Sequence, residues 1–432
     1  MRMNTARSVL PVLDTLRLTI PAEFFAPADV IWMQRQMHKL TKTDFTGSST
    51  DWSICTGLDL PSWADSFSLT VGSRITVEAS PKIYQGHNID GPQTLREAAH
   101  RIVDFVFGSV LRLASWPSAA RWYVARLDVT YSFDFVTRAA LESWFDTVAG
   151  IQRGQRRASV DVRANDDPLA VHAAPSGRTL YQGLGSRLKV GKIYCKGADL
   201  RAHPPRCLSA NKDFLDGLVE EFQPIARFEC QLRASWLSLQ ACRLGLLPAH
   251  MSTDLMGLLL ENAFPYLESR GMVPLKSRNA KKPIVYFTVA YLADYLDLNA
   301  VWDSEFSHLF AREVAMNDDT LIKELLSIAP KPGQALAAFD FYARIRVLGF
   351  SGARASVSKS AFYRYRRLLG SAGCSDAMLQ DGAPLIRSAP SVVNVRAFTP
   401  RRERLDLVEQ VHAHYLPANI DRLHAEVFRR SA

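Results

Sequence analysis

A tyrosine between two lysines is the feature of this sequence with the clearest potential for chemistry. It occurs in the stretch Leu188–Lys196, which reads LKVGKIYCK. If this stretch is a β-strand, alternation places Lys192, Tyr194 and Lys196 on the same face. Their ammonium groups could then stabilise a phenolate or a nearby phosphate. The pattern fits a tyrosine nucleophile that attacks a DNA phosphodiester, and it also fits a half-buried strand tyrosine beside solvated lysines.

Three carboxylates lie on the polar sides of other alternating segments. Asp128 follows Arg126 by two residues, Glu229 follows Arg227 by two, and Glu78 has a similar position in an earlier segment. Carboxylates that meet on one sheet face form a hard-oxygen site suited to Mg²⁺ or Mn²⁺. Such an ion would polarise a scissile phosphate. The alternative is that each carboxylate pairs with its own or a neighbouring arginine.

Histidines give a weaker indication of a metal site. His87, in the turn-rich segment QGHN, could be a ligand through its imidazole, or it could be solvated or cap a turn. His412 and His414 imitate a metal-binding His–x–His pair. They lie in a segment that reads as a helix, where side chains two residues apart diverge, so a surface helix is the better explanation.

A second basic feature lies near the C-terminus, in FYRYRR, residues 362–367. It belongs to the second of two predicted helices, Leu336–Leu348 and Lys359–Leu369, which are joined through Gly349–Ser358. This arrangement fits a helix-turn-helix-like reader of DNA. It fits equally an amphipathic helix with its arginines in water. The candidate DNA contacts on this helix are Arg364, Arg366 and Arg367.

The elements that must position these residues indicate an α+β fold. Segments with period-two alternation occur at residues 66–80, 123–135, 188–196 and 225–233, with helical patterns between them. They predict a mainly antiparallel sheet with helices on one face, so that the polar sides of the strands share the opposite, open face. From about Trp236 onward the pattern is mostly helical. We therefore expect one domain over residues 1–240 and a mostly α-helical domain over residues 241–432.

Composition limits the class of protein. The chain has 432 residues, 47% of them hydrophobic, which is ample for two or three domains. Its formal net charge of +9 favours a polyanionic partner. The six cysteines form no CxxC pair, which argues against a zinc site and for a reducing compartment. No run approaches the roughly 20 apolar residues that span a bilayer. We expect a soluble, cytoplasmic protein without a membrane partner.

Several motifs together resemble a known family. QGHN after VEASP, RLDVTYSF, RTLY followed by KIYCKGAD, ARFECQLR and FYRYRRLL occur in that order. This order resembles the replication initiators of filamentous phages, of the gene II type in the phage II/X family. The resemblance implies a rolling-circle initiator that nicks the plus strand of double-stranded origin DNA through a covalent 5′-phosphotyrosine. It also implies rejoining of the displaced single strand, a requirement for Mg²⁺, and a host helicase and polymerase as partners in the host cytoplasm.

The resemblance also assigns roles to residues. It implies that Tyr194 is the nucleophile, that Lys196 stabilises its charge, and that Asp128 and Glu229 bind the metal. Asp199 occupies a place where the family has glutamate, and its shorter side chain puts a metal role there in doubt. His87 and Glu78 are further candidate ligands, and Arg126, Lys192 and Arg227 are candidate DNA contacts. The alternatives are a plasmid-type initiator with the same chemistry and a non-catalytic DNA-binding regulator or repressor.

Overall fold

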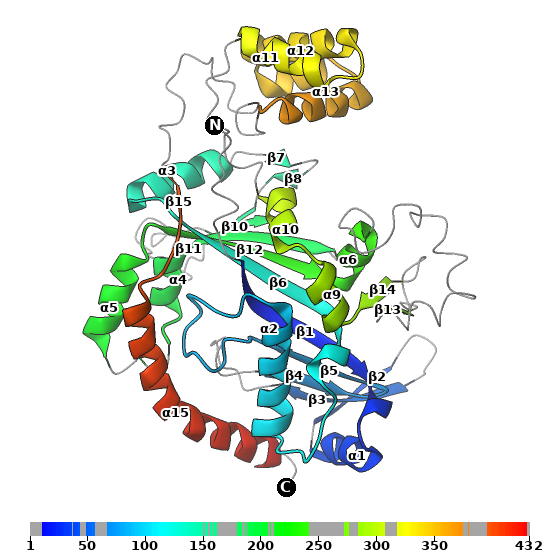
Figure 1. The fold of residues 1–432 in the computed structure, drawn as a ribbon, viewed down its shortest axis with the longest axis vertical. Coiled ribbons are helices and arrows are strands. Elements are labelled where there is room, and N and C mark those ends of the chain that lie inside the picture. The colour runs from blue at the N-terminus through cyan, green and yellow to red at the C-terminus, as the bar shows by residue number, and fades with distance from the viewer. Residues whose placement is uncertain are drawn as a thin grey trace.

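The computed structural model describes residues 11–36, 38–43, 49–56, 67–149, 152–153, 156–157, 159–161, 179–183, 186, 188–205, 208, 211–241, 272–275, 284–306, 318–374, 379 and 395–429. They form one large antiparallel sheet with surrounding helices and a three-helix unit that has its own core (Figure 1). The expected α+β class is confirmed. The C-terminal region is mostly helical, as predicted.

The strands that carry the candidate residues are neighbours in the sheet. The predicted alternating segments form β6 (Tyr123–Asp134), β11 (Lys189–Cys195) and β12 (Ile225–Arg233), with β12 between the other two. The described sheet has eleven strands in the order β2-β3-β4-β5-β1-β6-β12-β11-β10-β9, and β15 also pairs with β6. The other strands are β1 (Val12–Pro21), β2 (His38–Thr43), β3 (Ser49–Thr56), β4 (Phe67–Val71), β5 (Arg74–Ala79), β9 (Ser159–Asp161), β10 (Thr179–Gln182) and β15 (Arg396–Ala397).

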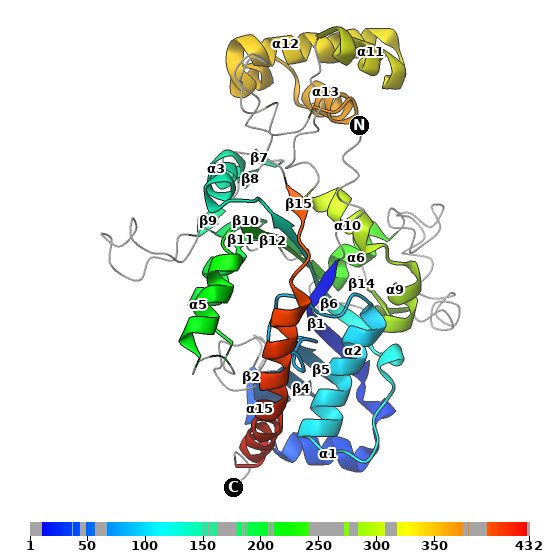
Figure 2. The same cartoon turned by 60° about the vertical axis from the view of Figure 1, so that its left-hand side comes forward.

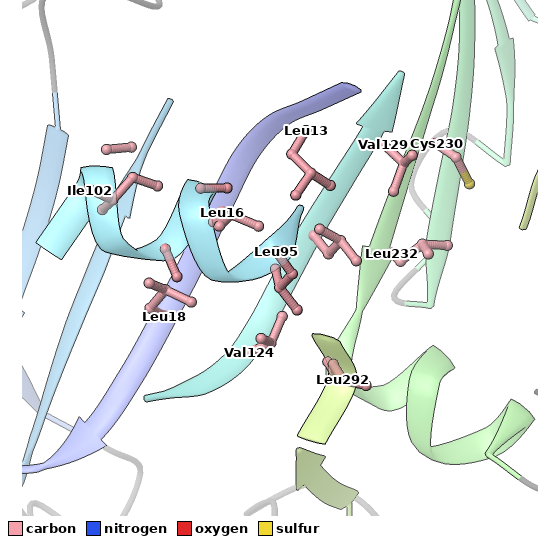
Figure 3. Close-up of a cluster of buried hydrophobic side chains, with 14 of the residues drawn as sticks. Leu13, Leu16, Leu18, Leu95, Ile102, Val124, Val129, Cys230, Leu232 and Leu292 are labelled. Atoms are coloured by element: carbon pink, nitrogen blue, oxygen red, sulfur yellow. The ribbon is translucent and has the colours of Figure 1, made fainter. Parts of the chain in front are cut away.

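The apolar side of the sheet faces a layer of helices. In α2 (Leu95–Val103), Leu95 and Ile102 lie over the buried Leu16 and Leu18 of β1 (Figure 3). Burying side chains of this size stabilises the fold by roughly 1.5–3 kcal/mol each. The same core includes residues of α3 (Arg138–Ala149), α6 (Ala234–Gln240), α9 (Val289–Tyr295) and α10 (Leu298–Glu305). This layer fixes the sheet, so that the strand ends and the polar face have a defined geometry.

The register of the central strands places their polar residues on one face. Tyr194 of β11 pairs with Arg227 of β12, and Lys192 pairs with Glu229. On the other side of β12, Glu229 pairs with Thr130 of β6. Directly opposed residues of an antiparallel pair project to the same side. The prediction of a shared polar face is therefore confirmed by the register.

The polar face is not open throughout, which corrects the expectation that helices cover only one side. The connection between β5 and α2, residues 80–94, folds against one end of this face. Helix α15 (Arg402–Arg429) holds this connection, because His412 of α15 contacts the carbonyl oxygen of Ile83 at 2.8 Å. The far part of α15 lies beside the region that follows α2 (Figure 2). The remaining cover comes from α4 (Lys196–Ala202) and α5 (Lys212–Glu221).

Residues on both sides of position 240 contribute to the main core. Strand β14 (Ile284–Phe287) and helices α9 and α10 pack against the sheet, and β15 pairs with β6. The division into residues 1–240 and 241–432 stays a prediction of domain organisation. A helix also expected over residues 251–270 lies outside the described part of the chain.

A three-helix unit follows, formed by α11 (Asp318–Ile328), α12 (Pro332–Ala355) and α13 (Lys359–Ser371). Its core includes Phe341 of α12 and Phe362 of α13. The predicted connection through Gly349–Ser358 is shorter than expected, because α12 breaks only at Gly349, with φ of 71°, and continues as a helix to Ala355. Among all described helices, none is both long and apolar enough to cross a membrane.

Candidate active site

Tyr194 lies near the end of β11 with its hydroxyl toward a carboxylate. The hydroxyl donates to Glu229 Oε2 at 3.4 Å, and Lys192 Nζ lies 4.4 Å from the centre of the tyrosine ring. Tyr194 is only 6% exposed. Burial raises the pKa of Tyr194 well above its usual value, and the opposing effect of Arg227 is smaller. The side chain is therefore a neutral phenol in this conformation, with Glu229 as the nearest proton acceptor.

Lys196 lies just beyond the strand, which corrects its predicted place on the strand face. It is the first residue of α4, and its Nζ donates to Asn88 Oδ1 and, at 2.7 Å, to Asp199 Oδ2. Burial lowers the pKa of Lys196 to about 8, although Asp199 acts in the opposite direction. The pKa of Asp199 is held low despite its burial, because Lys196 and His203 stabilise the carboxylate. In this conformation Lys196 is occupied by protein partners.

Asp128 pairs with the arginine two residues before it. Arg126 Nε donates to Asp128 Oδ1 at 2.9 Å, and Arg126 Nη1 donates to Glu78 Oε1 at 2.6 Å. Glu78 also pairs with Arg17 of β1. Burial raises the pKa of Asp128 to about 7, against the opposing effect of Arg126. The structure therefore contains the ion pairs that the sequence offered as the alternative to a metal site.

Arg227 is buried at the centre of a second charged cluster. Its guanidinium donates to Thr130 Oγ1 at 3.0 Å and to the carbonyl oxygen of Asn88, and it lies 3.4 Å from Asp14 Oδ1. Lys82 Nζ pairs with the same Asp14 carboxylate. Arg227 is 1% exposed, so the predicted DNA contact is not accessible in this conformation. By contrast, Lys192 and Arg126 are half-buried and keep part of their side chains at the surface.

His87 lies under α15. Its Nε2 is 3.2 Å from Glu409 Oε1, and Arg402 contacts the same carboxylate at 3.0 Å. Burial lowers the pKa of His87, and Glu409 opposes the shift. Of the two histidines in the His–x–His motif, His412 is buried against Ile83, whereas His414 is exposed. The two imidazoles diverge as the helical geometry predicts, although His412 is not a surface residue.

The arginines of α13 lie on the outer side of its helix. Arg364 and Arg367 are exposed and Arg366 is half-buried, whereas Phe362 and Leu369 are buried in the unit's core. This distribution is compatible with both interpretations of the helix. DNA contact by these three arginines stays a prediction.

Residues 37–240 match the family model that describes the N-terminal part of the replication-associated protein encoded by phage gene II. This region is similar to the gene II protein family. The resemblance to gene II-type phage proteins is thus confirmed. The matched residues include Tyr194, Glu229, Asp128, Lys196 and Arg227, whereas Asp14 and Arg17 of β1 precede the matched region.

The other comparisons add little. No curated protein matches the chain. A solved structure titled as a rolling circle replication initiator protein from Geobacillus stearothermophilus is similar at 13% identity, over 67% of this chain and 97% of that chain, with a TM-score of 0.25. The similarity to the gene II protein family therefore depends on the sequence match.

The predicted metal ligands of the gene II-type region do not come together as a complete site. Asp128 and Glu78 are paired with arginines, and His87 is held by Glu409. Within the described residues, no cluster of three or more histidine, cysteine, aspartate or glutamate side chains is arranged to hold a metal ion. Of these candidate ligands, Glu229 has the longest ion-pair distance, 3.5 Å to Lys192, and its Oε2 also accepts from Tyr194; it could give one carboxylate oxygen to a metal whose other ligands come from DNA.

Sequence reasoning missed the buried partners of this site. Asp14, Lys82 and Asn88 connect the start of β1 and the following loop to Arg227 and Lys196. The sequence indicates Asn88 only as part of the QGHN segment. The alternating pattern does not indicate Asp14 or Lys82. Asp14 lies at a register shift in β1, and Lys82 lies in a turn. Their roles follow from contacts between distant segments.

Proposed function

We propose that this chain is a rolling-circle replication initiator of the phage gene II type. In this proposal it nicks the plus strand of double-stranded origin DNA and later rejoins the displaced single strand into a circle. The observation that carries the proposal is the Tyr194–Glu229 hydrogen bond beside Lys192, on a charged sheet face whose Tyr194, Lys192 and Glu229 lie within the gene II-type region. A host polymerase would extend the new 3′ hydroxyl, and a host helicase would displace the strand.

The proposed cleavage is a transesterification. Glu229 accepts the phenol proton of Tyr194, and the tyrosine oxygen attacks the phosphorus of the scissile phosphodiester. The bond from phosphorus to the 3′ oxygen breaks, and the 3′ oxygen takes a proton to leave as a hydroxyl. The 5′ phosphate stays on Tyr194. Because the phosphotyrosine ester retains the phosphodiester bond, rejoining needs no nucleotide, which agrees with the absence of a GxxxxGK[ST] motif from the sequence.

Basic side chains on the face would bind the DNA phosphates. Lys192 and Arg126 reach the accessible part of the face, and Lys192 is placed to stabilise negative charge near the Tyr194 oxygen. Arg227, Lys82 and Lys196 lie deeper, where they hold the strands, the loop and α4 together. We therefore assign DNA contact to Lys192 and Arg126, and a structural role to Arg227.

Magnesium or manganese belongs to the proposal as a partner of Glu229. When bound by Glu229 and DNA phosphate oxygens, the ion would supply Lewis-acid polarisation of the scissile phosphate. Asp128, Glu78 and His87 are not assigned as ligands, because their present partners are arginines and Glu409.

A non-catalytic DNA-binding regulator is the second candidate function. The burial of Tyr194 favours it, because a nucleophile must reach its phosphate and Tyr194 is 6% exposed. In this alternative the basic helices bind DNA and the charged sheet face serves only as a scaffold.

A nicking assay separates the two functions. The protein would be incubated with Mg²⁺ and supercoiled circular DNA that carries its origin, and the products would be run on denaturing gels with and without proteolysis. The initiator predicts a nicked circle with protein on its 5′ end. Tyr194→Phe should abolish the nick and keep DNA binding, and Glu229→Gln should slow nicking by about 10²–10⁴-fold. Tyr295→Phe is the matched control, since Tyr295 is an exposed residue of α9.

The outcomes are distinct. Binding of origin DNA by the wild-type protein without any nick would support the regulator. Nicking by Tyr194→Phe at the wild-type rate would overturn the choice of nucleophile.

A further inference from the structure

Release of a closed circle requires more than one cleavage. After the first nick, Tyr194 is linked to the 5′ end of the displaced strand. When replication regenerates the origin, the new junction must be cut while Tyr194 is still occupied. The second cut therefore needs a nucleophile other than Tyr194, from this chain, from water or from another copy of the protein. This requirement rests on the proposed function.

A second tyrosine lies on the same face of the sheet. Tyr181 of β10 pairs directly with Lys192 of β11, and Thr179 pairs with Tyr194. Lys192 in turn pairs with Glu229 of β12. Because directly opposed residues project to the same side, the register places Tyr181, Lys192 and Glu229 in one row across three strands. Tyr194 lies one row away, within diagonal reach of Tyr181.

Lys192 interacts with both tyrosines. Its Nζ lies over the ring of Tyr194, and it is close enough to Tyr181 for the two to interact electrostatically. Burial lowers the pKa of Lys192, but Glu229, Asp199 and Tyr181 together raise it above its usual value. Lys192 is therefore a cation at neutral pH that could stabilise a developing phenolate on either tyrosine.

Tyr181 has the accessibility that a second nucleophile needs. Its side chain is half-buried, whereas Tyr194 is buried. Its hydroxyl makes no hydrogen bond to any residue in the part of the chain that the structure describes, so no structural partner there accounts for the phenol. Tyr131, for comparison, is buried and donates to the carbonyl oxygen of Leu298.

We propose that Tyr181 is the second nucleophile, which cuts the regenerated origin while Tyr194 holds the first 5′ end. The Tyr181 oxygen attacks the phosphorus of the new junction and its proton passes to water. The bond to the 3′ oxygen breaks, and that oxygen takes a proton to become a hydroxyl. The new 3′ hydroxyl then attacks the phosphorus on Tyr194. The strand closes into a circle, and Tyr194 recovers its proton.

The test uses protein already loaded at Tyr194. Wild-type protein would be reacted with one origin oligonucleotide, and the covalent adduct would be purified away from free protein. A second, end-labelled origin oligonucleotide is then added, and its cleavage is measured in a single turnover at several adduct concentrations. Once the labelled oligonucleotide is saturated with adduct, we expect the wild type to cleave at a rate independent of adduct concentration, and we expect a loss of at least about tenfold for Tyr181→Phe. The first nick by Tyr181→Phe should stay within about twofold of wild type.

Mass spectrometry gives an independent readout. Trypsin separates the two tyrosines, because residues 179–187 and residues 193–196 lie on different tryptic peptides. After the second cleavage, nucleotide phosphate should be found on the peptide of Tyr181 as well as on that of Tyr194. Tyr295→Phe is again the matched control, and thermal unfolding checks that Tyr181→Phe is folded.

Other results would overturn the inference. If the Tyr181→Phe adduct cuts the second oligonucleotide as fast as wild type, or if wild-type cleavage still rises with adduct concentration after the oligonucleotide is saturated, Tyr181 is not the second nucleophile. The proposed function would survive both results. If Tyr194→Phe nicks at the wild-type rate, the assignment of Tyr194 fails first, and the proposal for Tyr181 as the second nucleophile fails with it.

Discussion

Replacing Arg227 with methionine should destabilise the sheet much more than the same change at Arg17. Both arginines pair with a carboxylate on the polar face, but Arg227 is buried and the side chain of Arg17 is 49% exposed. Arg227→Met removes the donor to Thr130 and to Asn88, and one of the two cations beside Asp14. Loss of one member of a buried, hydrogen-bonded charge cluster costs about 3–5 kcal/mol. Because Lys82 remains beside Asp14, we expect a loss at the lower end of this range.

The matched change at Arg17 should cost about 0–1 kcal/mol, since exposed ion pairs contribute little. The assay is urea unfolding followed by tryptophan fluorescence, which reports on Trp122 and Trp302 in the main core. Equal losses for the two variants would refute the assignment of Arg227 to the interior cluster.

DNA binding by the same variants separates structure from contact. A phosphate contact contributes about one unit to the salt dependence of binding, so its loss lowers that slope. Folded Arg227→Met should keep the wild-type slope, whereas Lys192→Met should reduce it. A reduced slope for Arg227→Met would show that the arginine reaches DNA after a rearrangement.

Two further predictions concern stability. Gly197→Ala should lower the free energy of unfolding in urea by about 1–3 kcal/mol, because the new Cβ would lie 2.7 Å from the backbone nitrogen of Gln223 and from the carbonyl oxygen of Val219. Gly217→Ala in α5 is the control: its Cβ would meet no atom closer than 3.8 Å, so it should raise the free energy of unfolding by about 0.5–1 kcal/mol. Equal effects would contradict the close approach of α4 to α5. Burial lowers the pKa of Lys82 to about 7. Between about pH 7 and pH 10 the unfolded chain therefore binds more protons than the folded one. The free energy of unfolding should rise with pH across this window, by at most about 1.4 kcal/mol per pH unit from this group. Lys82→Met should flatten that rise, and an unchanged slope would show that the lysine does not titrate there.

Much of the sheet could be predicted from the sequence because alternation is a local property. The period-two pattern of residues 123–135 and 225–233 gave both strands and the sides on which Asp128 and Glu229 lie. The same pattern in LKVGKIYCK predicts that Lys192 and Tyr194 share one face. It also predicts that Lys196 belongs to the strand, whereas β11 ends one residue earlier, at Cys195. A helix begins at Lys196, where the packing of Gly197 against α5 decides the path of the chain.

The sequence by itself determined the α+β class, the shared polar face and the similarity of residues 37–240 to the gene II protein family. The tertiary structure decided which charges are neutralised and which side chains stay accessible. Asp14, Lys82 and Asn88 reach Arg227 and Lys196 from segments distant in sequence, and α15 holds the loop that carries two of them. The pKa of Tyr194 is raised because elements distant in sequence bury its side chain. Desolvation depends on every element packed around a group, so no local pattern of residues can reveal it.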